Sequence, residues 1–209
     1  HPIIEYPLVQ ENLSEIRSEN SALLASIFSV ADLQDQLDKD PKEEQKLLLR
    51  LLVNLNKYIS ALWSVNHLHH ALDVLAGNGA IESFSPIPRL LRDAIVCENW
   101  EGTHNTLRMQ ILKDISKYKV DQIFINHLNP THPALKKGLE KLKETLKDIE
   151  NPLAIKSIVD QMAILYAATQ LEKEAKTSLS KQNQFEYFLH LHFEKQPDVL
   201  TLIKSISTT

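Results

Sequence analysis

The chain has 209 residues, enough for one large domain or two small ones, and its 43% apolar content can supply a core. Only four glycines, among many Leu, Lys and Glu residues, favour an all-α fold, and the single cysteine, Cys97, excludes an intrachain disulfide and favours a cytoplasmic location. The net charge of −4 gives no reason to expect a nucleic acid as partner, and no run of about 18 apolar residues could span a membrane.

Two long helices are expected first. Apolar residues at helical spacing predict one over about residues 8–37, and Asp40-Pro41 offers an N-cap and a first helical residue for another that reaches Ala76. The Gly77-Asn78-Gly79 segment should end it, with a glycine in the left-handed conformation. The apolar stripes consist of Leu13, Ile16, Leu23, Leu24, Ile27 and Ala31 in the first helix, and Leu48, Leu51, Leu52, Leu55, Ile59, Leu62 and Leu75 in the second.

The next segment is irregular. A loop leads through Pro88 to a short helix over residues 89–94, and a turn follows at residues 100–102. Thr103 is a good N-cap for a helix that extends towards Tyr118. Long amphipathic helices must bury their faces against others, so residues 1–118 are expected to form an all-α helical bundle.

The helices after Tyr118 should be shorter, because four X-Pro pairs interrupt them. We expect residues 119–209 to form an extra C-terminal helical region packed on the bundle. Its strongest helix is predicted over residues 152–178, with an apolar side formed by Ile155, Ile158, Val159, Met162, Leu165 and Tyr166.

Glu101, which stands between Trp100 and Gly102, is the clearest candidate for chemistry. A carboxylate partly shielded by a large aromatic side chain suits a general base. The simpler interpretation is a carboxylate stabilised by the dipole of a following helix, and spacing alone favours this second interpretation.

Histidines form two further groups. His67, His69 and His70 suggest a metal site, but only His67 and His70 share a helix face, and no Cys, Asp or Glu follows at ligand spacing. We therefore expect no metal. His190 and His192 alternate with leucines and are expected on a helix surface.

Charged residues elsewhere favour structural roles. Arg92 and Asp93 are interpreted as an ion pair or a helix-end contact. The Lys-rich stretch 136–147 interleaves glutamates at spacings of three and four, which is typical of a solvated helix face. The absence of arginine after Arg108 argues against a groove for nucleic acid.

Residues 72–108 resemble the C-terminal signature of the acyl-CoA dehydrogenase family. That pattern has a Gly-Gly-x-Gly loop, an Arg-Asp-Ala, an aromatic-Glu-Gly-Thr and an Arg seven residues after the Glu. Here these fall at residues 76–79, 92–94, 100–103 and Arg108, and several matches at fixed spacing are more specific than any one alone. The helices after Tyr118 resemble those of the AidB-like branch.

The resemblance implies an FAD-dependent enzyme that oxidises a fatty acyl-CoA to the trans-2-enoyl-CoA. Glu101 corresponds to the catalytic base that removes the α-proton. Trp100, Glu101 and Gly102 correspond to the substrate-binding turn, and Trp100 also forms the wall beside the flavin. Arg92, Asp93 and Arg108 are expected to be structural.

The resemblance also assigns the cofactor contacts. Thr103 and Asn105 correspond to residues that touch the adenosine-diphosphate part of FAD, and Gly77 to a loop residue that approaches FAD from a neighbouring subunit. The chain departs from the family pattern at Ala76, where the family has glycine, and at Asp73, where it has glutamine.

Partners follow from the same resemblance: an acyl-CoA substrate, an electron-transfer partner or other acceptor, and further copies in a homo-oligomer. The chain starts with His1 rather than Met, so we interpret it as a piece of a longer protein that is inactive alone. The alternative is a flavoprotein that keeps the family fold for a structural, assembly or regulatory role with little dehydrogenase activity.

Overall fold

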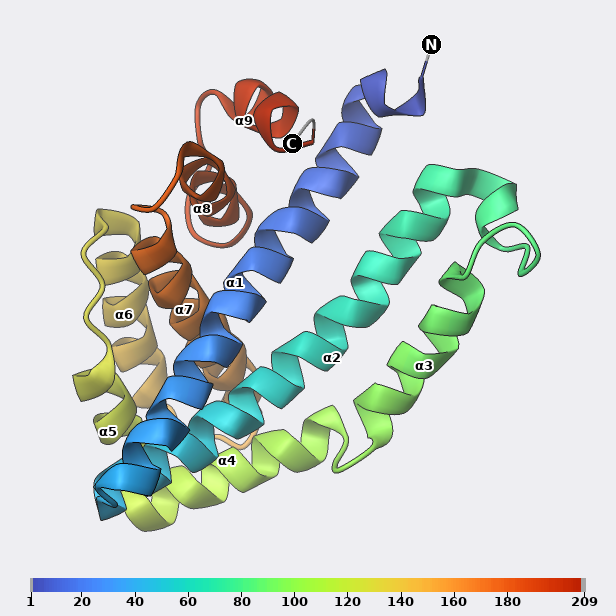
Figure 1. Ribbon diagram of the computed structural model, residues 1–209. Coiled ribbons are helices and arrows are strands. Elements are labelled where there is room, and N and C mark those ends of the chain that lie inside the picture. Colours follow the sequence, from blue (N-terminus) through green and yellow to red (C-terminus); the bar gives the residue numbers. More distant parts are fainter. Residues whose placement is uncertain (1, 208–209) are drawn as a thin grey trace.

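The computed structural model describes residues 2–207, and this part of the chain consists of helices and loops without a strand (Figure 1). The expected all-α fold is confirmed. No helix of these residues combines the length and apolarity that crossing a membrane requires. The elements are the 3₁₀ turn η1 (Ile3–Glu5) and the helices α1 (Pro7–Lys39), α2 (Glu43–Gly79), α3 (Ile87–Asn99), α4 (His104–Tyr118), α5 (Val120–His127), α6 (Pro133–Leu146), α7 (Ala154–Glu174), α8 (Leu179–His192) and α9 (Val199–Ser207).

The reversal between α1 and α2 differs from the prediction. Asp40 donates its backbone N–H to the Gln36 carbonyl, so it belongs to the end of α1 and is not the N-cap of α2. The N-cap of α2 is Lys42, which has extended backbone angles, and the helix starts at Glu43. Two antiparallel helices need a few non-helical residues to turn round, and Pro41 falls among them.

The end of α2 also departs from the prediction. The residue with positive φ is Ala76, at φ 50° and ψ −142°, and not one of the glycines that follow it. Gly79 is needed for a different reason: a Cβ atom there would lie 2.9 Å from the Leu72 carbonyl oxygen. After the kink the chain thus folds back closely on α2.

Replacing Ala76 with glycine should stabilise the chain. An L-residue in this region of φ and ψ costs about 1–3 kcal/mol, of which the larger backbone entropy of unfolded glycine offsets about 0.5–1 kcal/mol. We expect Ala76→Gly to raise the melting temperature by about 2–4 °C. Ala80→Gly is the control: Ala80 has ordinary helical angles, so this change should lower the melting temperature. A lower melting temperature for Ala76→Gly would show that the backbone conformation of Ala76 does not cost stability.

Of the six residues predicted for the apolar stripe of α1, Leu23 alone is fully buried. Leu24 and Ile27 are 52% and 45% exposed, and Phe28 beside them is exposed too. Small side chains allow α1 to lie close to α2, α7 and α8 instead. The buried residues of this face include Ser14, Ser18, Ser21, Ala22, Ala25 and Ser26.

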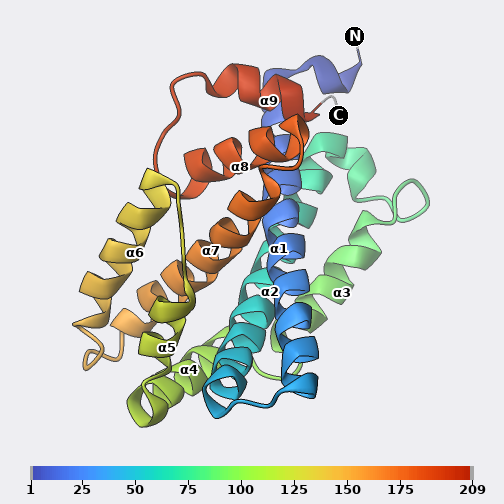
Figure 2. The same ribbon diagram turned by 60° about the vertical axis from the view of Figure 1, so that its left-hand side comes forward.

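Helix α7 lies at the centre of the molecule, in contact with α1, α2, α4, α6 and α8 (Figure 2). All the apolar residues predicted for its inner side are buried, as are five of the seven predicted for α2. One hydrophobic core contains residues from before and after Tyr118. The division into residues 1–118 and 119–209 stays a proposal about sequence organisation, and in the structure the two parts share that core.

Candidate functional site

The turn between α3 and α4 has the geometry that the sequence predicted at its start and end. Trp100 closes α3, which is longer than the expected helix over 89–94 because nothing between Pro88 and Asn99 interrupts it. Thr103 is the N-cap of α4, and its Oγ1 accepts the Thr106 N–H at 3.4 Å. Between them, Glu101 has a φ of 58°. A non-glycine residue in the left-handed region is uncommon and costs energy, so this turn is held by its surroundings.

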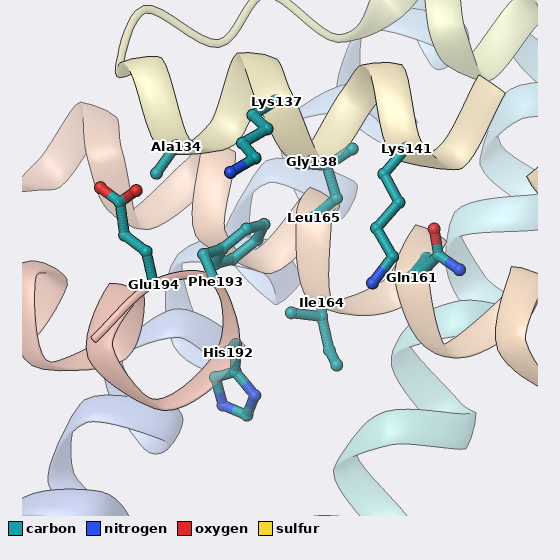
Figure 3. Close-up of a pocket in the computed structure, with 10 residues that line it drawn as sticks. All are labelled: Ala134, Lys137, Gly138, Lys141, Gln161, Ile164, Leu165, His192, Phe193 and Glu194. Carbon is teal, nitrogen blue, oxygen red and sulfur yellow. The ribbon is translucent and has the colours of Figure 1, made fainter. Parts of the chain in front are cut away.

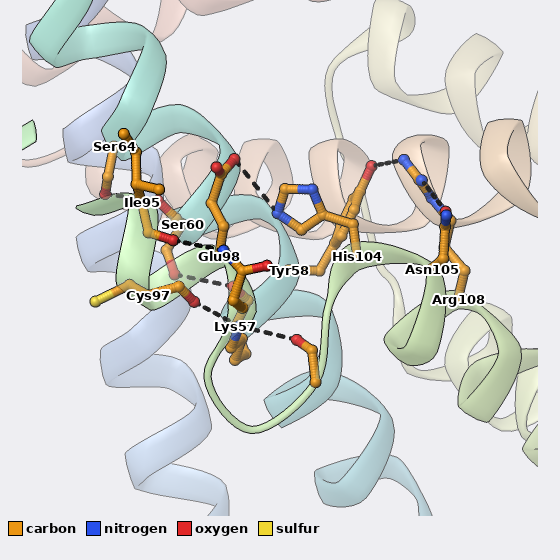
Figure 4. Close-up of polar contacts among 12 residues, drawn as sticks. Lys57, Tyr58, Ser60, Ser64, Ile95, Cys97, Glu98, His104, Asn105 and Arg108 are labelled. Carbon is orange, nitrogen blue, oxygen red and sulfur yellow. Dashed lines mark hydrogen bonds and ion pairs between the residues drawn. The ribbon is translucent and has the colours of Figure 1, made fainter. Parts of the chain in front are cut away.

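Lys57 of α2 is the main group that holds the turn (Figure 4). Its Nζ donates to the carbonyl of Cys97 at 2.7 Å and to the carbonyl of Gly102 at 3.2 Å. One ammonium group therefore ties the last turn of α3 to the residue after Glu101. Lysine can satisfy two carbonyls at once because it carries three donors.

A cleft of about 340 Å³ opens between α2 and α3 next to this turn. Trp100 and Glu101 line it together with Lys57 and Cys97. Trp100 is 64% exposed and Glu101 is also exposed, so both side chains are available to a ligand. The structure thus brings the predicted base and its aromatic neighbour to the same cleft.

The first turn of α4 offers hydrogen-bond donors. The first N–H groups of a helix have no acceptor inside it, and together with the helix dipole they favour a negatively charged group. Asn105 accepts a hydrogen bond from Arg108 Nη1 at its Oδ1, at 3.1 Å, which leaves its amide hydrogens free to donate. Thr103 and Asn105 are both exposed, and this set of donors fits a phosphate-bearing cofactor.

Behind this surface, Arg108 and Tyr58 join α4 and α2 to α7. Arg108 Nη2 donates to the Tyr58 hydroxyl at 2.5 Å, and that hydroxyl donates to Asp160. The guanidinium also lies over the Tyr58 ring, 4.9 Å from its centre. Burial, followed by the hydrogen bond to Asp160, raises the pKa of Tyr58 to about 12. The expected structural role of Arg108 fits these contacts, whereas sequence reasoning missed Lys57, Tyr58 and Asp160.

Gly77 lies apart from these residues. It is at the end of α2, and the 13 residues of α3, about 20 Å of helix, separate it from the turn that carries Glu101 (Figure 1). A Cβ atom at Gly77 would meet nothing within 4 Å, so a ligand could approach its backbone. Asp73, one turn earlier, is exposed and its Oδ2 lies 3.5 Å from the Asn12 amide nitrogen.

One predicted charge interaction needs correction. Arg92 pairs with Glu82 at 2.6 Å rather than with its neighbour Asp93, because side chains adjacent in a helix point in different directions. The partner comes from the loop before α3. The ion pair ties that loop to the helix.

The prediction for His192 also needs correction. His192 is not a surface residue: it stacks on Trp63, and its Nε2 lies 2.9 Å from Oε1 of the buried Glu19. His67, also buried, lies 2.6 Å from the other oxygen of Glu19. Burial alone would raise the pKa of Glu19, but the hydrogen bonds from His192 and His67 outweigh it and lower the pKa.

The pKa of Glu19 predicts a stability loss in acid. Since its pKa is lower in the folded than in the unfolded chain, the ionised carboxylate stabilises the fold above about pH 4.3, and this contribution is lost as the pH falls below that value. We expect Glu19→Gln to lower the free energy of unfolding by about 1–3 kcal/mol at pH 7, and by less at pH 3.5. Urea unfolding at the two pH values measures this. An equal loss at both would show that the charge of Glu19 does not stabilise the fold.

The family can now be assigned. The model of the acyl-CoA dehydrogenase C-terminal domain matches residues 1–116, more than half of the chain. The chain belongs to the acyl-CoA dehydrogenase family. The turn with Glu101 and the N-cap Thr103 lie inside the matched region.

Two curated acyl-CoA dehydrogenase relatives are similar in sequence. Putative acyl-CoA dehydrogenase AidB of Escherichia coli (strain K12) is 30% identical over 117 residues, which are 56% of this chain and 21% of that protein. Acyl-CoA dehydrogenase family member 11 of Caenorhabditis elegans is 25% identical over 151 residues, 71% of this chain and 24% of that protein. The chain thus spans less than a quarter of either relative.

Solved structures extend the likeness beyond Tyr118. The Bd2924 apo-form is 27% identical with a TM-score of 0.73, over 81% of this chain and 34% of that one. Caenorhabditis elegans ACDH-11, solved in complex with C11-CoA, has a TM-score of 0.78 over 92% of this chain and 37% of its own, at 21% identity. The second likeness shows that this acyl-CoA dehydrogenase shares the fold of most of the added helices.

Proposed function

We propose that this chain is the C-terminal part of a flavin-dependent acyl-CoA dehydrogenase that oxidises a fatty acyl-CoA to the trans-2-enoyl-CoA. The observation that carries the proposal is the turn with Glu101: a carboxylate in a left-handed conformation, held by Lys57 and open to a cleft. Strained residues cluster at functional sites, and a purely structural turn would favour glycine at such a φ.

The proposed chemistry assigns one role to each residue of the turn. The carboxylate of Glu101 removes the α-proton of the thioester, and the backbone N–H of Glu101 donates to the thioester carbonyl, where negative charge develops. Gly102, at φ 119°, lets backbone and substrate come close. Trp100 covers the reacting carbons and keeps water away.

Thr103, Asn105 and the first N–H groups of α4 would hold the phosphate part of FAD, and Gly77 would contact the FAD of a neighbouring subunit in a homo-oligomer. When bound, the flavin accepts the β-hydrogen as hydride, and an electron-transfer partner or other acceptor reoxidises it. These donors fit an anionic cofactor, because N–H groups at a helix start favour a negatively charged group.

The absorbance spectrum of the complete protein tests the proposal. We expect a flavin spectrum that is bleached by acyl-CoAs of a preferred chain length, because substrate oxidation reduces the flavin. A flavin spectrum that no acyl-CoA bleaches would favour the alternative, a family member with a structural, assembly or regulatory role.

Lys57→Met tests how the turn is held. Methionine keeps most of the length of the unbranched side chain but cannot donate to the two carbonyls, so Glu101 should leave its position more often. In the complete protein we expect kcat to fall about tenfold, equivalent to about 1.4 kcal/mol, with KM changed less than twofold. Lys46→Met is the control, because Lys46 is also on α2 but pairs at the surface with Glu43. An unchanged kcat for Lys57→Met would mean that the hydrogen bonds from Lys57 are not needed to hold the turn.

A further inference from the structure

A second cavity, of about 210 Å³, lies where α6, α7 and the end of α8 meet (Figure 3). None of its lining residues belongs to the cleft beside Glu101, so the two sites are separate. Its apolar surface comes mainly from Ile164, Leu165 and Phe193. The Phe193 ring lies against Gly138, where an added Cβ would be 2.7 Å from the ring. The absence of a side chain at Gly138 therefore helps to shape the cavity.

Two lysines of α6 border this cavity. Lys137 and Lys141 are one helical turn apart, and their side chains extend from α6 towards α7 and the end of α8 (Figure 3). Within residues 2–207 the ammonium group of neither lysine makes an ion pair or a hydrogen bond. Lys143 and Lys147 of the same region, in contrast, each pair at 2.7 Å with the glutamate three residues earlier. Two unpaired ammonium groups beside an apolar cavity leave room for an anionic partner.

The charges of the lining residues limit what that partner can be. Glu194 is the only carboxylate among them, so with Lys137 and Lys141 the lining carries one net positive charge. His192 also borders the cavity, but its Nε2 faces the carboxylate of Glu19. One net positive charge matches a monoanion better than a phosphate dianion.

The volume of the cavity limits the size of the apolar part of the ligand. An apolar cavity of about 150 Å³ is known to bind benzene, so about 210 Å³ has room for a ring with one small substituent. We propose that this cavity binds a small aromatic monocarboxylate, with the carboxylate between Lys137 and Lys141 and the ring against Phe193 and Ile164. The site does not depend on the activity proposed for Glu101.

The probe for this site is 4-(trifluoromethyl)benzoate, titrated into the complete protein at low salt and followed by fluorine NMR. We expect saturable binding that weakens at least tenfold in the double variant Lys137→Met/Lys141→Met. The neutral analogue 4-(trifluoromethyl)benzamide should also bind at least tenfold more weakly. Acetate should not compete, because it lacks the apolar part.

Matched variants separate this cavity from any other site. Lys143→Met/Lys147→Met removes the same charge from the same region and should leave the affinity unchanged. Ile164→Trp should block the cavity without a change of charge. The proposal is overturned if the benzoate shows no saturable binding, if the Lys137/Lys141 variant binds it like the wild type, or if the amide binds equally well. Melting temperatures of all variants confirm that they are folded.

Discussion

In the complete protein, Glu101→Gln should lower kcat on acyl-CoA by about 10²–10⁴-fold, the usual contribution of a general base. The amide keeps the shape of the side chain but cannot accept the α-proton. The transition state therefore loses more than the ground state, and KM and flavin content should change little. Steady-state kinetics and the flavin absorbance of the purified variant measure the two effects.

Glu98→Gln is the matched control for this experiment. Glu98 is also a carboxylate near the turn, but it faces His104, with 3.8 Å between Oε1 and Nε2. Its removal should leave kcat within about threefold of the wild type, an energy difference of less than 1 kcal/mol. Near-normal turnover of Glu101→Gln would place the base elsewhere and would refute its assignment to Glu101.

Glu172→Gln should cause the largest loss of stability. Glu172 is buried on α7, and its carboxylate accepts the Thr131 N–H, the Thr131 hydroxyl at 2.5 Å and the His132 N–H at 2.5 Å. An amide directs N–H groups at some of these donors and removes the charge. Since hydrogen bonds to a charged group contribute about 1.5–3 kcal/mol each, we expect a loss of about 3 kcal/mol.

Thermal unfolding measures this loss as a melting temperature about 6–12 °C lower. Glu174→Gln is the control on the same helix, because Glu174 forms a partly exposed ion pair with Lys181 at 2.8 Å. Such pairs are worth about 0–1 kcal/mol, so the control should shift the melting temperature by less than about 4 °C. Equal shifts for the two variants would show that Glu172 does not hold the loop before α6.

Local signals made part of the site predictable. Thr103 caps α4 through atoms three residues apart, and the Gly102 turn interrupts the helical pattern within a few residues. The hydrogen bonds that hold this turn and the helix behind it were not predictable from the sequence. Lys57 is 45 positions from Gly102, and Tyr58 is 102 positions from Asp160. A lysine in a helix pattern looks like a surface residue until the opposite helix is known.

The fold shows the same limit. In α2 and α7, large apolar residues predominate on one side of the helix. The buried faces of these two helices therefore followed from the periodicity of the sequence. In α1, Leu24 and Ile27 are exposed while small residues take their place beside Leu23 on the buried side, so the rule that large apolar residues are buried misplaced part of the stripe. His192 was misplaced for a related reason: alternation with leucines does not reveal that Glu19 and Trp63 come from other helices to meet it.

The packing of α1 has a consequence for synthesis on the ribosome. This first helix contacts α7, α8 and α9, and near its start Ser14 donates to the Ile203 carbonyl at 3.1 Å while Arg17 donates to that of Ile206. These partners are translated 189 residues later. Since chains fold as they emerge, at about 5–20 residues per second, α1 and α2 wait roughly ten seconds or more with their buried faces uncovered. Exposed apolar surface promotes aggregation, so the nascent chain should depend on chaperones most strongly during this interval.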